Sequence, residues 1–147
     1  MNIGYAIWLE RLDSPIIKCQ VIEVLEKISM LIPGSRFYMF AFQPIYRILS
    51  ELQPLIKLKE ELNNIKINLI IIPTFTPYIP KPSWFSAKWY MLLPILLQTA
   101  PVFLFLILIK KIEILHCRSY PIMIPVIVIK KIIKHLKIVF DSSSPWP

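Results

Sequence analysis

Residues 112–141, IEILHCRSYPIMIPVIVIKKIIKHLKIVFD, decide the fold class of this chain. An Ile- and Leu-rich segment at 112–115 leads into polar residues, then into a lysine-edged apolar segment, then into the apolar segment 137–141. This order predicts a strand, a loop, a helix and a second strand. Ligands of an open parallel sheet bind outside the carboxyl ends of its strands. The polar side chains after residue 115 are therefore candidates for a binding site.

The sequence before residue 112 predicts the same alternation of strands and helices. Short apolar or aromatic segments predict three earlier strands, at residues 3–8, 36–42 and 65–72. Ser14 followed by Pro15 is typical of a helix start, and residues 33–34, Pro-Gly, are typical of a helix end. The apolar residues of this helix recur at helical spacing and are expected on its buried side: Ile17, Val21, Val24 and Ile28.

Two prolines shape the segment between the second and third strands. Pro44 can open a helix, whereas Pro54 should interrupt one, because an interior proline removes a backbone hydrogen bond and clashes with the preceding turn. We expect two short helices, the second carrying Leu55, Leu58 and Leu62 inward. The whole pattern predicts an α/β fold, with a parallel sheet of about five strands and helices on both faces.

Residues 91–109 have two interpretations. They carry no charge, follow Trp84 and Trp89, and precede two lysines, which fits a membrane span. Proline and polar residues interrupt the run, however, and a strand-like segment follows at once. A helix that is apolar all round can equally be buried against a sheet. We expect a buried or membrane-surface helix, and the alternative is a small membrane-anchored, non-enzymatic protein.

Charge and length limit the classes of partner. A chain of 147 residues is expected to form one domain, and its net charge of +8 permits nucleic acid, anionic lipid or phosphorylated partners. A nucleic acid partner is not expected, because no binding motif is present. Four lysines form one dense patch at helical spacing: Lys130, Lys131, Lys134 and Lys137. They form either a solvated helix face or a site that attracts lipid or phosphate.

Cysteines and glycines exclude several chemistries. Cys19 and Cys117 lie far apart without metal-ligand neighbours, so neither a disulfide framework nor a zinc site is expected. The N-terminus lacks the features of a secretory signal, and a cytoplasmic location is expected. Gly4 and Gly34 are the only glycines, so no glycine-rich phosphate loop can form and no cofactor is expected.

Three of the four residues that follow the fourth predicted strand are candidate site residues. His116 could exchange a proton near neutral pH, although a lone histidine can also be structural. Arg118 could bind phosphate or carboxylate, or it could pair with a nearby acid. Ser119 could cap the next helix and leave backbone N–H groups directed at an anion. Asp141, at the end of the fifth predicted strand, could hold the neighbouring loop or face a cleft.

Several segments together resemble the N-terminal domain of family 4 glycosyltransferases. The likeness covers essentially the whole chain in order of elements and is most specific in its first and last thirds. The segments that carry it are SPII at 14–17, Gln20 and Val21, HCRSY at 116–120, the lysine-rich helix, KIVFD at 137–141, and Trp146 with Pro147.

This resemblance implies half of a GT-B architecture, in which two Rossmann-like domains face each other across a cleft. The N-terminal domain would receive the acceptor, and the C-terminal domain would hold the nucleotide-sugar donor. His116 would face the reaction centre as the catalytic residue, and Arg118 with Ser119 would contact acceptor or phosphate. The nucleotide-sugar would be a substrate of the complete enzyme.

The chain also departs from the family. Residues 9–13 lack the glycines common after the first strand, and serines occupy 142–144 where an Arg-Gly pair is common. The resemblance implies that residues 1–147 make up only the N-terminal domain, so we expect the donor-binding domain to be absent and the chain to be inactive alone. The expected partners are a separate chain carrying the donor half, a sugar or lipid-linked acceptor, and an anionic membrane surface. The expected location is cytoplasmic, peripheral at most at the inner face of the membrane.

Overall fold

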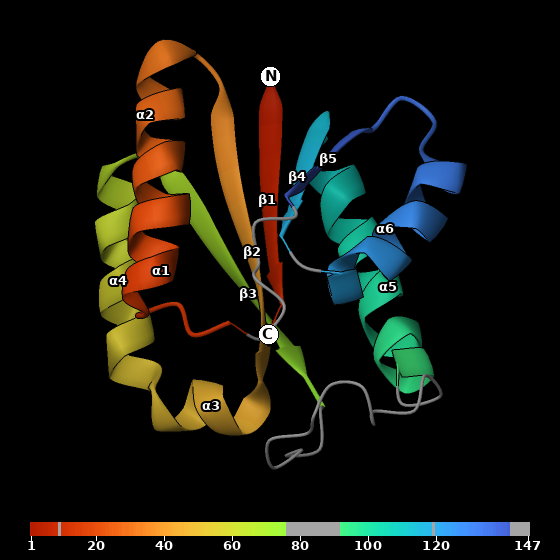
Figure 1. The fold of residues 1–147 in the computed structure, drawn as a ribbon, viewed down its shortest axis with the longest axis horizontal. Coiled ribbons are helices and arrows are strands. Elements are labelled where there is room, and N and C mark those ends of the chain that lie inside the picture. Colours follow the sequence, from red (N-terminus) through yellow and green to blue (C-terminus); the bar gives the residue numbers. More distant parts are fainter. Residues whose placement is uncertain (9, 76–91, 119, 142–147) are drawn as a thin grey trace.

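The computed structural model describes residues 1–8, 10–75, 92–118 and 120–141, and Figure 1 shows them as one open sheet between two layers of helices. The sheet has the strand order β3-β2-β1-β4-β5, and neighbouring strands are parallel. The strands are β1 Asn2–Trp8, β2 Arg36–Pro44, β3 Ile67–Thr74, β4 Ile114–Arg118 and β5 Lys137–Asp141. The predicted α/β fold with a five-stranded parallel sheet is confirmed.

Helices cover both faces of this sheet, as Figure 1 shows. One layer contains α1 Pro15–Ile17, the π-helix η1 Lys18–Ile22, α2 Glu23–Leu31 and α4 Leu52–Asn64, with the short α3 Ile45–Ser50 before α4. The other layer contains α5 Leu92–Ile109 and α6 Tyr120–Ile132. Each layer encloses its own buried cluster of apolar side chains. The central strands are apolar on both sides because each side packs against helices.

The first helix starts where the sequence predicts. Ser14 Oγ accepts a hydrogen bond from the backbone N–H of Ile17 at 3.3 Å, and Pro15 occupies the first helical position. The π-helix η1 has a wider turn than an α-helix, so it changes which side chains of the following α2 face the sheet. As a result Leu25 is buried and Val24 is 43% exposed, so the prediction that Val24 faces the core is wrong.

Two helices follow β2, but Pro54 does not separate them. The break lies at Glu51, and Pro54 is the third residue of α4. A proline in the first turn of a helix is tolerated, because the N–H that it lacks has no partner within the helix. Leu55 and Leu62 are buried as predicted, and Leu58 packs partly buried against the same cluster.

The fourth strand ends later than the sequence suggests. We predicted a strand at 112–115 with His116 at its tip, whereas β4 runs Ile114–Arg118 and His116 is its third residue. Pairing with both neighbours extends β4, because Arg118 lies opposite Ile7 of β1 and Asp141 of β5. The prediction that His116 ends the strand is therefore wrong, and Arg118 holds that position.

Helix α5 packs against the sheet through one of its sides. Phe103 and Ile107 are buried, and the Phe103 ring meets the rings of Phe40 and Phe42 edge-on at 5.4 and 5.2 Å between centroids. The first residue of the predicted segment, Met91, lies outside the described residues. Within the part of the chain that the structure describes, no helix is long and apolar enough to cross a membrane.

Candidate functional site

A cluster of polar side chains lies on the α1 side of the sheet, near the carboxyl ends of its central strands. Tyr5 of β1 lies opposite His116 of β4, and Arg118 lies opposite Asp141 of β5. Alternate residues of a strand share a face, so His116 and Arg118 point the same way. Tyr5 belongs to the buried cluster under α1 and α4, which identifies that face.

Arg118 is the centre of this cluster and is only 2% exposed. Its Nε donates to Glu10 Oε2 at 3.2 Å, and its Nη2 donates to Gln20 Oε1 at 2.7 Å. Its Nη1 lies 3.8 Å from Asp141 Oδ2 and has no hydrogen-bond partner among the described residues. The arginine thus joins the segment after β1, the π-helix and the end of β5. This geometry favours the acid-paired interpretation of Arg118.

Burial and the charge of Arg118 together shift the pKa values of the neighbouring side chains. Burial raises the pKa of Glu10, and the positive charge of Arg118 offsets only part of that rise. Burial also raises the pKa of Tyr5 to about 12, so its hydroxyl stays protonated. Burial lowers the pKa of Arg118, but the neighbouring Tyr5 hydroxyl and the charges of Glu10 and Asp141 together outweigh that effect, so the guanidinium stays charged.

His116 is half-buried beside this network. Its ring packs edge-on against Tyr5, with 4.6 Å between ring centroids. Burial lowers the pKa of His116, while the charges of Asp141 and Arg118 act in opposite directions. The imidazole is therefore neutral at neutral pH, with one nitrogen that can donate a hydrogen bond and one that can accept.

The other predicted site residues are less informative. Ser119 lies outside the described residues, so its predicted role stays a prediction. Asp141 contacts Arg118 through its carboxylate. Cys117 is buried and Cys19 is exposed, and both are free thiols. Within the described residues, no group of His, Cys, Asp or Glu side chains could hold a metal ion.

Sequence reasoning missed Tyr5, Glu10 and Gln20 as members of the cluster. Only tertiary structure brings them to Arg118, since Glu10 and Gln20 are 108 and 98 residues away along the chain. A signal was present for Glu10, because a carboxylate directly after a parallel strand lies at the edge where ligands bind.

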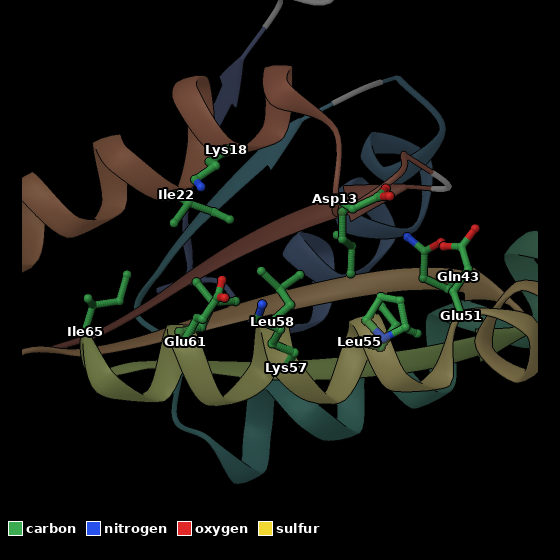
Figure 2. Close-up of a pocket in the computed structure, with 13 residues that line it drawn as sticks. Asp13, Lys18, Ile22, Gln43, Glu51, Leu55, Lys57, Leu58, Glu61 and Ile65 are labelled. Carbon is green, nitrogen blue, oxygen red and sulfur yellow. The ribbon is translucent and has the colours of Figure 1, made fainter.

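Sequence reasoning also missed a groove between η1 and α4, which Figure 2 shows. Its volume is about 360 Å³, and it extends from Asp13 and Gln43 to Ile65. Apolar side chains such as Leu55 and Leu58 line it, and charged side chains, among them Lys18, also border it. No local sequence motif predicts this groove, because its walls come from distant parts of the chain.

The fold and this cluster define a Rossmann-like α/β domain. No family model matches the sequence, and no curated protein is significantly similar to it. One similar solved structure is a glycosyltransferase from Rickettsia africae ESF-5, with a TM-score of 0.56 and 16% sequence identity. The match covers 95% of this chain and 28% of the Rickettsia chain. The chain therefore has a glycosyltransferase-like fold and spans less than a third of that protein's length.

Proposed function

We propose that this chain is the acceptor-side, N-terminal domain of a family 4 type glycosyltransferase, which transfers a sugar from a nucleotide-sugar to an acceptor. The observation that carries this proposal is the likeness of nearly the whole sheet and its helices to part of a glycosyltransferase. The neutral, half-buried His116 near the carboxyl ends of the central strands supports it.

We assign His116 the catalytic role. Its neutral imidazole can accept a proton from an acceptor hydroxyl, or hold that hydroxyl by a hydrogen bond. For Arg118 we propose a narrower role than direct phosphate binding, because Glu10 and Gln20 already engage two of its nitrogens. Its Nη1, which lacks a hydrogen-bond partner among the described residues, is the donor left for an acceptor or phosphate oxygen. Ser119 follows Arg118 directly and is proposed as a further acceptor or phosphate contact.

The donor half is proposed to come from a separate chain, and this chain is proposed to be inactive without it. β5 lies at one edge of the described sheet, where another strand could add. A sugar or a lipid-linked sugar is the proposed acceptor. The proposed location is the cytoplasm, peripheral at the inner face of the membrane.

A two-part experiment tests this function. A reading frame directly downstream that encodes a donor-binding domain would support a split enzyme, and its product should restore sugar transfer when mixed with this chain. In the restored enzyme, His116→Ala should reduce turnover by roughly 100-fold or more, as expected for loss of a general base. His135→Ala is the matched control, because His135 is exposed beyond the end of α6. Equal activity of the two variants would refute the role of His116.

A further inference from the structure

The outer sides of α5 and α6 expose an apolar surface that the sugar-transfer site does not use. Each of its nine large apolar side chains is at least 39% exposed: Leu97, Val102, Phe105, Leu108 and Ile109 on α5, and Ile124, Ile127, Val128 and Ile132 on α6. We call these residues the α5–α6 face. Monomeric soluble proteins rarely expose an apolar patch of this extent, and such patches mark interaction sites.

The α5–α6 face is hollowed between its two helices. A groove of about 300 Å³ runs between Leu97, Pro101 and Leu104 of α5 and Val128 and Ile132 of α6. The described residues that line it are all apolar. A groove without a hydrogen-bonding side chain suits an aliphatic chain better than a polar ligand.

Positive charge flanks this face at one end. The strands are parallel, and both helices lead back to the starts of β4 and β5, so their carboxyl ends lie at the same edge of the sheet (Figure 1). Lys111, Lys131 and Lys134 are exposed there. Lys130 instead forms hydrogen bonds within the chain, since its Nζ donates to the backbone oxygens of Lys134 and Leu136 at 2.6 Å each.

Negative charge is missing from the same elements. Helices α5 and α6 contain no Asp or Glu, and the one acidic residue between them along the chain, the exposed Glu113, accepts a hydrogen bond from the backbone N–H of Asn2. A partner for this region must therefore offer an apolar surface bordered by negative charge. The interface of an anionic bilayer offers both, with acyl chains below phosphate headgroups.

We propose that the α5–α6 face binds the surface of an anionic lipid bilayer. The exposed apolar side chains enter the boundary between headgroups and acyl chains, the groove takes part of an acyl chain, and the three exposed lysines contact lipid phosphates. This inference deepens the peripheral location proposed above by naming the surface and the lipid charge. Its test needs no sugar transfer, so it can fail while the proposed function stands.

Vesicle flotation of the full chain tests the apolar part. The chain should float with vesicles of phosphatidylcholine and phosphatidylglycerol, and far less with phosphatidylcholine alone. Phe105→Ser combined with Ile132→Ser should weaken binding by at least roughly tenfold, since two large side chains no longer leave water. The matched control is Met30→Ser with Leu31→Ser, because these α2 side chains are 70% and 79% exposed in the opposite helix layer.

A second pair of variants tests the charges. Lys131→Gln with Lys134→Gln should weaken binding to the anionic vesicles by roughly 30-fold, given the usual contribution of a lysine near such a surface. Lys57→Gln with Lys59→Gln removes the same charge from exposed positions of α4 and should leave binding unchanged. Added salt should weaken binding of the original chain.

A labelled chain keeps the proposal testable if the serine variants fail to fold. In a Cys19→Ser background, Leu108→Cys carrying an environment-sensitive fluorophore should shift to the blue with anionic vesicles, and Met30→Cys should not. Equal binding to neutral vesicles, equal shifts at both positions, or no binding would overturn the proposal. So would light scattering that shows a dimer dissociated by Phe105→Ser without vesicle binding, because the face would then join two copies.

Discussion

At the scale of single residues, Arg118 links more of the molecule than any other side chain in the polar cluster. A buried guanidinium is costly to desolvate, and this cost is offset only when acceptors surround it. Glu10 and Gln20 accept hydrogen bonds from the guanidinium, and Asp141 adds a negative charge 3.8 Å away, each from a separate segment. The arginine therefore fixes the position of the segment after β1 relative to the ends of β4 and β5.

Replacing Arg118 should destabilise the fold. Arg118→Met leaves the carboxylate of Glu10, whose side chain is 28% exposed, without its cation. We expect the free energy of unfolding to fall by about 3 kcal/mol, as for other broken ion pairs that are largely buried. Urea denaturation followed by circular dichroism measures this change. Arg11→Ala is the control, because its ion pair with Asp13 is exposed and should contribute little. Equal losses in the two variants would contradict the central role of Arg118.

His116 should make stability depend on pH. Burial lowers its pKa below the usual 6.5, so the folded chain binds fewer protons than the unfolded chain as the pH falls below that value. The contribution of His116 to stability is therefore present above pH 6.5 and lost as the pH falls through the lowered pKa. The free energy of unfolding of the original chain, minus that of His116→Phe, should therefore decrease as the pH falls from about 8 to about 5.

Glu10 does not disturb this comparison, although its raised pKa acts with the opposite sign. Its contribution is present at low pH and lost as the pH rises through its raised pKa, but both proteins retain Glu10. Parallel urea titrations at several pH values measure the difference. A difference that stays constant over this range would show that burial does not shift His116.

At the scale of elements, α5 has two sides with different roles. Its inner side places Phe103 between two aromatic rings of β2, whereas its outer side exposes Phe105 by 61%. The helix has no polar side that could mark the solvent, so periodicity alone could not tell which residues face the sheet. Packing against Phe40 and Phe42 decides the orientation.

Truncating Phe103 and Phe105 one at a time should change the free energy of unfolding by very different amounts. Phe103→Ala should lower the free energy of unfolding by about 3–5 kcal/mol, because it leaves a cavity in the core. Phe105→Ala should change it by less than about 0.5 kcal/mol, as is usual for an exposed side chain. Thermal and urea denaturation without lipid measure both. Similar losses in the two variants would contradict this placement of α5.

At the scale of the whole molecule, one sheet separates two cores that share no helix. Cys117 lies in the core under α5 and α6, and burial raises the pKa of its thiol to about 12. Cys19 is exposed on η1, which belongs to the other helix layer. The two thiols should therefore differ in their reactivity in the folded state.

Thiol labelling should distinguish them. In the folded chain a thiol reagent should modify Cys19 readily, while Cys117 should react only at the rate of unfolding, because a buried and protonated thiol is inert. Reaction of a Cys19→Ser variant, followed across urea concentrations, measures the opening of this core. Rapid labelling of Cys117 without urea would contradict its burial.

The sequence by itself determined the fold class and the order of the elements. Apolar strand segments, the helix start at Ser14 and Pro15, and the leucines of α4 have local causes in periodicity and capping, so a single sequence reveals them. The sequence also marked the region of His116 and Arg118. It could not locate the end of β4, because pairing with β1 and β5 extends that strand beyond its apolar residues.

Tertiary structure alone decided what surrounds Arg118 and which side of α5 faces water. Glu10, Gln20 and Asp141 reach the arginine only after the strands have assembled in the order β3-β2-β1-β4-β5. The π-helix likewise rotates the first helix so that Leu25 replaces Val24 in the core. In each case the deciding free energy comes from contacts between residues distant in sequence, which local patterns do not encode.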